Sequence, residues 1–283
     1  MKVLFISDFT LEQRQGGAQV SNDLLIKKGR ELGHDITEHH HSSSIMDFLT
    51  SYDLVIHSNL EAISKISPEK MGFILGLDNC VRLEHDSCSY LNPEDRELLF
   101  KKAKKNFFLT KYHLSFFQEL YGDYFENVEI VYDPIDTDIF KKEERSEKSY
   151  DVVYCGYLHP LKGLNNLLNF ARSNPDRTVD IFGWSDQNPN HLFDGVPNVT
   201  FRGQEDHHKM ASIFQSCKAV FHSPVVREPF CRMVGEALLC GVEEIIGDTS
   251  KIGAYLELQD VGYDVFQEGC KNATTNFWER IKL

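Results

Sequence analysis

The sequence predicts an α/β protein with two doubly wound domains, each a parallel sheet covered by helices on both faces. Short β-rich apolar runs alternate with helical periods along the whole chain, as expected for strands buried between helices. Residues 2–33 then have the order strand, glycine pair and helix, which is how a nucleotide-binding sheet opens. The alternation is interrupted at residues 141–149, which are charged and almost free of apolar side chains. We therefore expect a first domain over residues 1–140 and a second over residues 150–283, facing each other across a ligand cleft.

The composition indicates which kinds of binding partner the protein has and in which cellular compartment it works. The 283 residues are enough for two hydrophobic cores. Acidic residues outnumber basic ones, 43 to 30, and the formal charge of −13 argues against a nucleic-acid partner but not against a nucleotide. Seven scattered cysteines without a C-x-x-C pair favour a reducing compartment and offer no metal-ligand spacing. The apolar run at residues 3–6 is too short for a secretory signal, so we expect a cytoplasmic protein.

The first domain begins with a buried strand at residues 2–8. After it, Gly16 and Gly17 permit either a close backbone approach to a phosphate or a tight turn, and Gly33 ends the following helix. The G-x-G-x-x-G fingerprint is absent, which disfavours an NAD enzyme. Further strands are expected near residue 36 and at residues 53–57, 72–76, 81–85, 106–110 and 128–132, with helices at residues 92–105 and 111–121.

A basic cluster lies at the end of the helix predicted for residues 92–105, formed by Lys101, Lys102, Lys104 and Lys105. Lysines are favourable near the C-terminal pole of a helix, so a solvated helix end is one interpretation. Weak peripheral contact with a membrane surface, or with an anionic acceptor, is the other.

The second domain repeats the alternation. Strands are expected at residues 150–155, 178–182, 199–201, 219–222, 245–246, 255–258 and 263–266, with helices at residues 164–171, 206–216 and 275–283.

The most informative segment of this domain is residues 227–241. Pro229 fixes φ where a helix can begin, and Gly241 is a natural stop. Glu228 should therefore lie on the loop entering the helix, with Glu236 about two turns inside. A helix N-terminus attracts phosphates, whereas two flanking carboxylates would accept hydrogen bonds from ligand hydroxyls. Together these features predict a site for a phosphorylated sugar.

Residues 227–241 resemble the E-x7-E signature of the retaining, family 4-like glycosyltransferases (glycosyl transferases group 1), which have the GT-B fold. The usual form of the signature is E-P-F-G-x-x-x-x-E-A-x-A-x-G, and Cys231 stands where glycine is common. The resemblance extends over nearly the whole chain. It implies that Glu228 binds the hydroxyls of the donor sugar, that Glu236 accepts the ribose hydroxyls, and that Phe230 and Cys231 lie in the donor site.

Other positions match weaker landmarks of the family. The resemblance implies that Gly16 and Gly17 contact the donor phosphate, and that His85 approaches the reacting sugar on the acceptor side. For His85 a structural role, hydrogen-bonded after a strand, stays open. Lys162, in the stretch G-x-L-x-x-x-K-G, is implied to neutralise the diphosphate. The backbone at Gly203 and Gln204 is implied to contact the base.

Three departures from the family pattern concern the phosphates and the end of the chain. Tyr157 replaces a diphosphate-binding arginine. Arg232, near the predicted helix N-terminus, can take over that role through bidentate bonds or can form a salt bridge instead. Residues 249–258 lack the usual Gly-Gly-x-x-Glu, and the chain is short for the family.

The D-x-D sequence at Asp136 and Asp138 has the form of a metal–diphosphate site. We reject that role, since the segment is similar to the one ending the first domain of family 4-like enzymes, which use no such metal.

The sequence therefore predicts a metal-independent retaining glycosyltransferase, without cofactor, that moves a sugar from a nucleotide-diphosphate sugar to a glycan, lipid or other acceptor. A lysine and a helix N-terminus can stabilise the leaving diphosphate without a metal. No carboxylate pair suits a glycosidase. The alternatives are a GT-B sugar-nucleotide epimerase and a catalytically silent nucleotide-sugar-binding module. Donor sugar, base, acceptor, linkage and oligomeric state do not follow from the sequence.

Overall fold

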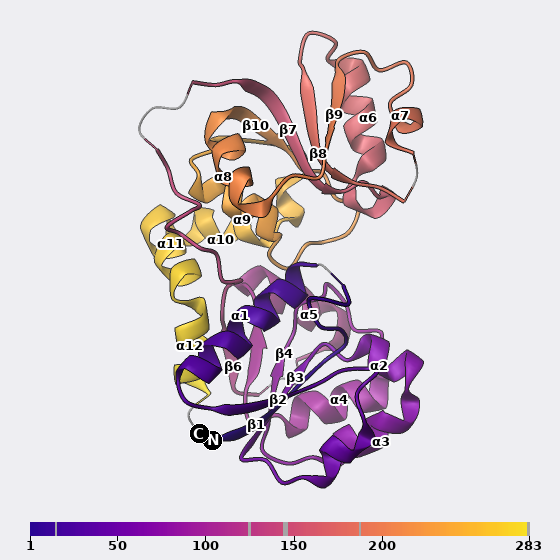
Figure 1. The fold of residues 1–283 in the computed structure, drawn as a ribbon, viewed down its shortest axis with the longest axis vertical. Helices are drawn as coiled ribbons and strands as arrows, with labels where there is room; N and C mark the ends of the chain where they lie inside the picture. The colour runs from indigo at the N-terminus through magenta and orange to yellow at the C-terminus, as the bar shows by residue number, and fades with distance from the viewer. Residues whose placement is uncertain (15, 124–125, 144–146, 187, 282–283) are drawn as a thin grey trace. The chain divides into compact units, whose positions relative to one another are not determined.

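The computed structural model describes residues 1–14, 16–123, 126–143, 147–186 and 188–281. The chain separates into two compact units, the first comprising Met1–Pro134 with Lys271–Leu283 and the second Ile135–Cys270 (Figure 1). Each unit is a parallel sheet with helices, which confirms the predicted GT-B fold class. The described chain contains no helix long and apolar enough to span a membrane.

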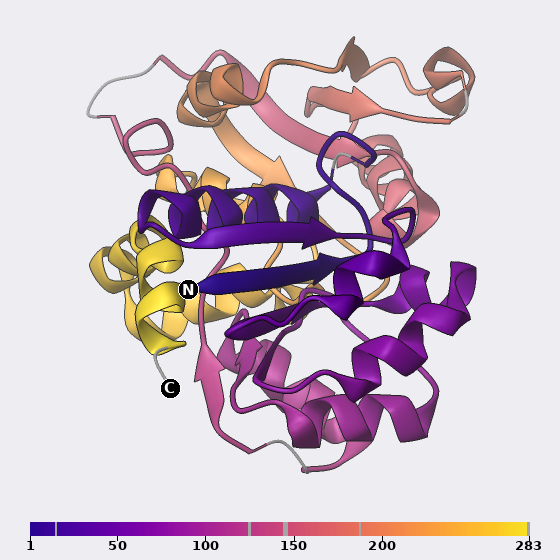
Figure 2. The same ribbon diagram turned by 60° about the horizontal axis from the view of Figure 1, so that its bottom comes forward.

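The sheet of the first unit has the strand order β2-β1-β3-β4-β5-β6, and every pairing is parallel. The order reverses at β1, which is the switch point of a doubly wound sheet. Its strands are β1 (Lys2–Ser7), β2 (Asp35–His39), β3 (Leu54–Ser58), β4 (Cys80–Leu83), β5 (Asn106–Phe108) and β6 (Val128–Ile130). Its helical segments are α1 (Gly17–Glu31), η1 (Ile45–Leu49), α2 (Glu61–Ile66), α3 (Pro68–Gly76), α4 (Pro93–Lys102), α5 (Lys111–Tyr121) and α12 (Ala273–Arg280). Figure 2 shows the indigo helix α1 running along β1 and β2.

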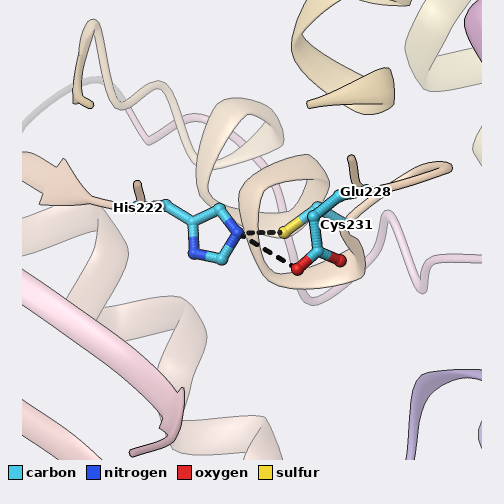
Figure 3. Close-up of side chains that lie close together, drawn as sticks. All are labelled: His222, Glu228 and Cys231. Carbon is cyan, nitrogen blue, oxygen red and sulfur yellow. Dashed lines mark hydrogen bonds and ion pairs between the residues drawn. The ribbon is translucent and has the colours of Figure 1, made fainter. Parts of the chain in front are cut away.

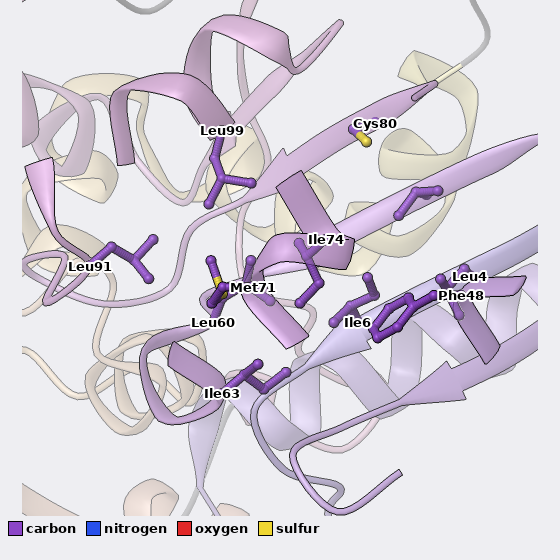
Figure 4. Close-up of a cluster of buried hydrophobic side chains, with 11 residues drawn as sticks. Leu4, Ile6, Phe48, Leu60, Ile63, Met71, Ile74, Cys80, Leu91 and Leu99 are labelled. Carbon is purple, nitrogen blue, oxygen red and sulfur yellow. The ribbon is translucent and has the colours of Figure 1, made fainter. Parts of the chain in front are cut away.

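One apolar core of this unit lies between the sheet and helices α2 to α4 (Figure 4). Residues 72–76, expected as a strand, belong to α3 instead. Pro68 occupies the start of this helix, and Met71 and Ile74, three positions apart, are both buried in the core. A short apolar run does not by itself distinguish a strand from a buried helix, which is why the expectation was wrong.

The end of the chain packs in the first unit rather than with residues 150–270. The indole Nε1 of Trp278 donates to the carbonyl of Leu25 at 2.8 Å, and Phe277 lies against Phe107 with ring centroids 4.8 Å apart. A Cβ added at Gly29 would lie 2.3 Å from the Trp278 ring, so glycine is required for this approach of α1 and α12. The unit boundary of the structure thus differs from the predicted range 150–283. The last two residues of the helix expected at 275–283 lie outside the described residues, as do residues 144–146 of the predicted linker.

The four lysines of the predicted basic cluster each contact a group within the first unit. Lys101 pairs with Glu97, and Lys104 donates to the side chain of Asn79. Lys102 donates to the carbonyl of Leu75, and Lys105 to that of Arg280. The four lysines are thus bonded locally, and both interpretations of the cluster, a solvated helix end or contact with a membrane surface or an anionic acceptor, stay predictions.

The sheet of the second unit has the order β11-β10-β7-β8-β9, again with every pairing parallel. Its strands are β7 (Tyr150–Tyr157), β8 (Val179–Trp184), β9 (Val199–Gly203), β10 (Cys217–Phe221) and β11 (Glu244–Ile246). Its helical segments are η2 (Pro160–Lys162), α6 (Leu164–Ser173), α7 (Pro189–Leu192), α8 (His207–Ser216), α9 (Arg232–Leu239), η3 (Thr249–Lys251), α10 (Gly253–Val261) and α11 (Tyr263–Lys271).

Two further strands expected in this unit are helices. Residues 255–258 lie in α10 and residues 263–266 in α11. Gly262, with φ +82°, separates the two helices. Phe266 and Cys270 are four positions apart and both buried, so the apolar residues of α11 follow a helical period.

Candidate functional site

The carboxyl ends of β7 and β10 bring Lys162 and Glu228 together. Because the strands are parallel, the segments that follow them emerge at one edge of the sheet. Lys162 ends η2, after β7, and its Nζ lies 2.7 Å from Oε1 of Glu228, in the loop after β10. A Cβ on Gly163, at φ +89°, would lie 2.1 Å from the carbonyl oxygen of Ser223. Glycine after Lys162 therefore allows the two loops to meet.

Helix α9 begins at Arg232, later than Pro229 predicts. Cys231 precedes it with φ +68° and ψ 80°, a left-handed conformation that costs a residue with a Cβ about 1–2 kcal/mol. This backbone explains why glycine is common at the position. Since the helix starts at Arg232, Glu236 lies slightly more than one turn inside, not two. The N-terminus of α9 carries no side-chain cap.

The His222 cluster, which we define as His222, Glu228 and Cys231, lies beside this helix start (Figure 3). Nε2 of His222 is 3.2 Å from Sγ of Cys231 and 3.6 Å from Oε1 of Glu228. Burial disfavours the charged imidazole, but Cys231 and Glu228 outweigh it and raise the pKa of His222 to about 10. Burial likewise opposes the charge on Glu228, but His222 and Lys162 outweigh it and lower the pKa of Glu228 to about 2. Glu228 is therefore an ionised acceptor at neutral pH.

Glu236 is bonded separately, to Arg232 and His207. Its Oε1 accepts from Nε2 of His207 at 2.8 Å and from Nε of Arg232 at 2.9 Å. The hydrogen bond to Glu236 raises the pKa of His207. Nη1 of Arg232 is buried without a hydrogen-bond partner among the described residues. Arg232 thus forms an ion pair within its own helix, and a role on a diphosphate stays a prediction.

The remaining residues predicted for the donor site are one buried side chain, Phe230, and the backbone of Gly203 and Gln204. Phe230 is 1% exposed and stacks on Phe266, so its side chain serves packing in the second unit. Gly203, with φ +84°, ends β9, and Gln204 follows it. Their backbone lies at the same sheet edge as Lys162, since β8 and β9 are parallel. Contact of this backbone with a base stays a prediction.

An aromatic stack occupies the place where the family pattern has arginine. The ring of Tyr157 lies on Trp184, with centroids 4.0 Å apart, and on His159 at 5.2 Å. Its hydroxyl donates to the carboxylate of Asp186. The position therefore offers a phosphate no cation.

The first unit carries the predicted acceptor-side residues. Gly16 is the N-cap of α1, and Gly17 is its first residue. His85 follows β4 and is buried, with Nε2 3.1 Å from Oδ1 of Asn22, a residue of α1. Its Nδ1 is 3.8 Å from Asp133. Burial lowers the pKa of His85, so the ring is neutral at pH 7. This environment suits either of the predicted roles, a residue near the reacting sugar or a structural residue.

A buried charge cluster in the first unit was not predicted. Arg82, on β4, pairs with Glu84 at 2.8 Å, and both side chains are fully buried. Burial raises the pKa of Glu84 to about 7, although Arg82 opposes the shift. Burial also raises the pKa of Glu61, whose two carboxylate oxygens have no hydrogen-bond partner among the described residues. Sequence spacing gives no signal that Glu61 lies near Arg82 and Glu84, because Glu61 comes from a separate element, α2.

Two groups of potential metal ligands occur in the described part of the chain: the His222 cluster, and Glu61 with Glu84 and Asp86. The D-x-D sequence forms a local turn, in which the amide of Asp138 donates to Oδ1 of Asp136 at 3.0 Å.

Comparison with known proteins relates this geometry to enzymes that handle sugars. Residues 135–268 match the family described as glycosyl transferases group 1. A search of curated proteins found no significant match.

Three solved structures resemble the fold of the whole chain. The Anabaena protein HepE in complex with UDP-glucose has 16% identity and a TM-score of 0.65, covering 99% of this chain and 95% of that one. Sucrose-phosphate synthase from Thermosynechococcus elongatus has 11% identity and a TM-score of 0.67, covering 99% and 94%. WaaG, a glycosyltransferase of lipopolysaccharide biosynthesis, has 14% identity and a TM-score of 0.65, covering 99% and 92%.

Proposed function

We propose that the chain is a glycosyltransferase whose donor is a nucleotide-diphosphate sugar, because residues 135–268 match the family model described as glycosyl transferases group 1. We propose further that the reaction retains configuration, needs no metal, and uses a glycan, a lipid or another hydroxyl compound as acceptor. The protein similar in fold, HepE, was crystallised with UDP-glucose, so uridine nucleotides are the first donors to test.

The observation that carries the proposal is the Lys162–Glu228 pair beside the uncapped N-terminus of α9. A leaving nucleoside diphosphate needs its developing charge stabilised more than it needs a proton. The Lys162 side chain is 44% exposed, so it can turn from Glu228 to a phosphate oxygen. The start of α9, which has no side-chain cap, supplies a second, fixed source of positive potential.

Glu228 and Glu236 divide the hydroxyl groups of the donor between them in this proposal. Glu228 is ionised because its pKa is about 2, and it accepts hydrogen bonds from the sugar. Glu236, held by Arg232 and His207, accepts from the ribose. Loss of Glu228 should therefore affect the sugar nucleotide, whereas loss of Glu236 should affect any ligand that contains the ribose.

The test combines a donor screen with turnover. Nucleotide sugars, UDP-glucose first, are screened by thermal shift, because a bound donor stabilises the native state by mass action. Release of the nucleoside diphosphate is then measured with glycan and lipid acceptors. Failure of every donor both to bind and to react would overturn the proposal.

Two variants locate the donor sugar. Glu228→Gln should weaken binding of the sugar nucleotide by about 1.5–3 kcal/mol. The affinity for the free nucleoside diphosphate should stay within about threefold of wild type. Glu243→Gln, the same chemical change at an exposed position of this unit, is the matched control. Equal behaviour of the two variants would contradict the role given to Glu228. Thermal unfolding of both variants establishes that they are folded.

A further inference from the structure

The His222 cluster contains three kinds of metal ligand in one place. Figure 3 shows the thiol of Cys231 and the carboxylate of Glu228 on the same side of the His222 ring, both directed toward Nε2. The ligand atoms of the three residues all lie within 4.8 Å of one another. His222 and Glu228 are buried and Cys231 is partly exposed, so a small ion can reach the cluster from solvent.

The spacing of these atoms is close to that around a tetrahedral zinc ion. Zinc bonds of about 2.0 Å to nitrogen or oxygen and about 2.3 Å to sulfur place ligand atoms about 3.3–3.6 Å apart. The observed separations are 3.2 Å from nitrogen to sulfur and 3.6 Å from nitrogen to oxygen. Side-chain shifts of a few tenths of an ångström would bring these two pairs to the geometry of a metal site.

The conformation of Cys231 is a second observation that supports a site. A side chain at φ +68° is strained, and strained residues cluster at active sites and ligand-binding sites. The residue contributed at this point is a thiol, placed against an imidazole and a carboxylate. The combination of sulfur, nitrogen and oxygen ligands favours zinc over magnesium or calcium, which prefer oxygen alone.

We propose that His222, Glu228 and Cys231 form a zinc-binding site, with a fourth position open to water. On binding, Cys231 releases its thiol proton and His222 releases the proton on Nε2, both to the solvent, because zinc binds a thiolate and a neutral imidazole. Two features limit the affinity. Lys162 already pairs with Glu228, and Nδ1 of His222 has no hydrogen-bond partner among the described residues to orient the ring. Lack of such a partner weakens zinc binding about 10–100-fold, so we expect a Kd of about 1 µM rather than that of a structural zinc site.

Zinc at this site competes with the donor, because it engages the carboxylate that the proposed function assigns to the donor sugar. Zinc therefore inhibits turnover and does not assist it. This inhibition rests on the proposed function, whereas zinc binding rests on the cluster alone. A protein that binds zinc at the cluster but transfers no sugar would contradict only the proposed function.

Binding is tested on the full chain after treatment with EDTA and removal of the chelator. Zinc is titrated in competition with a chromophoric zinc indicator, and Co²⁺ is added separately to detect the charge-transfer band of a thiolate ligand. We expect about one equivalent of zinc and a thiolate–cobalt band. Absence of either would overturn the proposal.

Four variants assign the site. Cys231→Gly, which suits the backbone and should fold, and His222→Gln should each lose the zinc equivalent, and Cys231→Gly should also lose the cobalt band. Cys88→Ser, a partly exposed cysteine in the first unit, is the matched control and should keep both. Lys162→Met should increase the affinity for zinc about tenfold, because the ammonium group that competes for Glu228 is removed. Zinc binding that survives in Cys231→Gly, or that is lost in Cys88→Ser, would overturn the assignment.

Discussion

Replacing Glu236 with glutamine is expected to weaken binding of the nucleoside diphosphate and of the sugar nucleotide by the same factor, because both ligands contain the ribose. Glutamine keeps an acceptor oxygen and removes the charge. A hydrogen bond to a charged group contributes about 1.5–3 kcal/mol, and the substitution should cost the lower value. That corresponds to about a tenfold increase in Kd.

The structure explains why glutamine is a sharper change here than alanine. Glu236 accepts from Arg232, whose side chain is only 13% exposed, and from His207. Alanine would leave the guanidinium of Arg232 with neither the charge nor the acceptor oxygen of Glu236, and breaking a buried ion pair in this way costs about 3–5 kcal/mol of stability, whereas glutamine still accepts the hydrogen bond from Nε. Loss of binding in Glu236→Ala would then include a folding defect.

Isothermal titration calorimetry with UDP and with UDP-glucose measures the two affinities, and Glu243→Gln serves again as the control. Unchanged affinity for UDP in Glu236→Gln would remove Glu236 from the nucleotide site. A loss confined to UDP-glucose would also refute the reasoning, because it would place Glu236 on the sugar.

Three other outcomes are expected. Turnover of the wild type should persist in EDTA, and the variant Asp138→Ala should remain active. Loss of turnover in EDTA that Mg²⁺ or Mn²⁺ restores would contradict metal independence. In urea unfolding, the free energy of unfolding of Cys231→Gly should stay within about 1 kcal/mol of wild type, because relief of backbone strain offsets the lost thiol contact. Cys231→Val should be less stable by about 1–3 kcal/mol. Equal stability of the two variants would contradict the strain at this position. Burial raises the pKa of Glu84 from 4.5 to about 7, so the folded state holds a proton that the unfolded chain has released. The stability of wild type relative to Glu84→Gln should therefore be highest below pH 4.5 and fall by about 3 kcal/mol as the pH rises to about 7, and a constant difference in urea unfolding would refute this.

Much of this architecture follows from local sequence. The first strand, the glycine pair and the helix after it were predicted because each has its own period or breaker. The sequence stretch around Lys162 and the loop at Glu228 were both predicted to line one site, and their side chains are bonded in the structure. The strands predicted at residues 72–76, 255–258 and 263–266 were wrong. Their apolar runs are too short for the hydrophobic period to distinguish a strand from a helix.

The candidate site depends on distances that no spacing in the sequence encodes. His222 is the last residue of the strand predicted at residues 219–222, and Glu228 and Cys231 come close to it only through the loop that leads into α9. His207 reaches Glu236 from another helix. The family pattern identified position 231 as unusual, but the left-handed backbone that explains it is visible only in the structure.

The packing of α12 in the first unit affects the order of events during synthesis. Trp278 and Phe277 reach the ribosome exit after all of residues 135–270 have been made. The second unit is continuous in the chain, so it can fold as soon as it emerges. The first unit must wait, with the surface of α1 around Gly29 uncovered, until its own last helix arrives. A nascent chain stalled before residue 271 would therefore carry a folded second unit and a first unit that exposes apolar surface to chaperones.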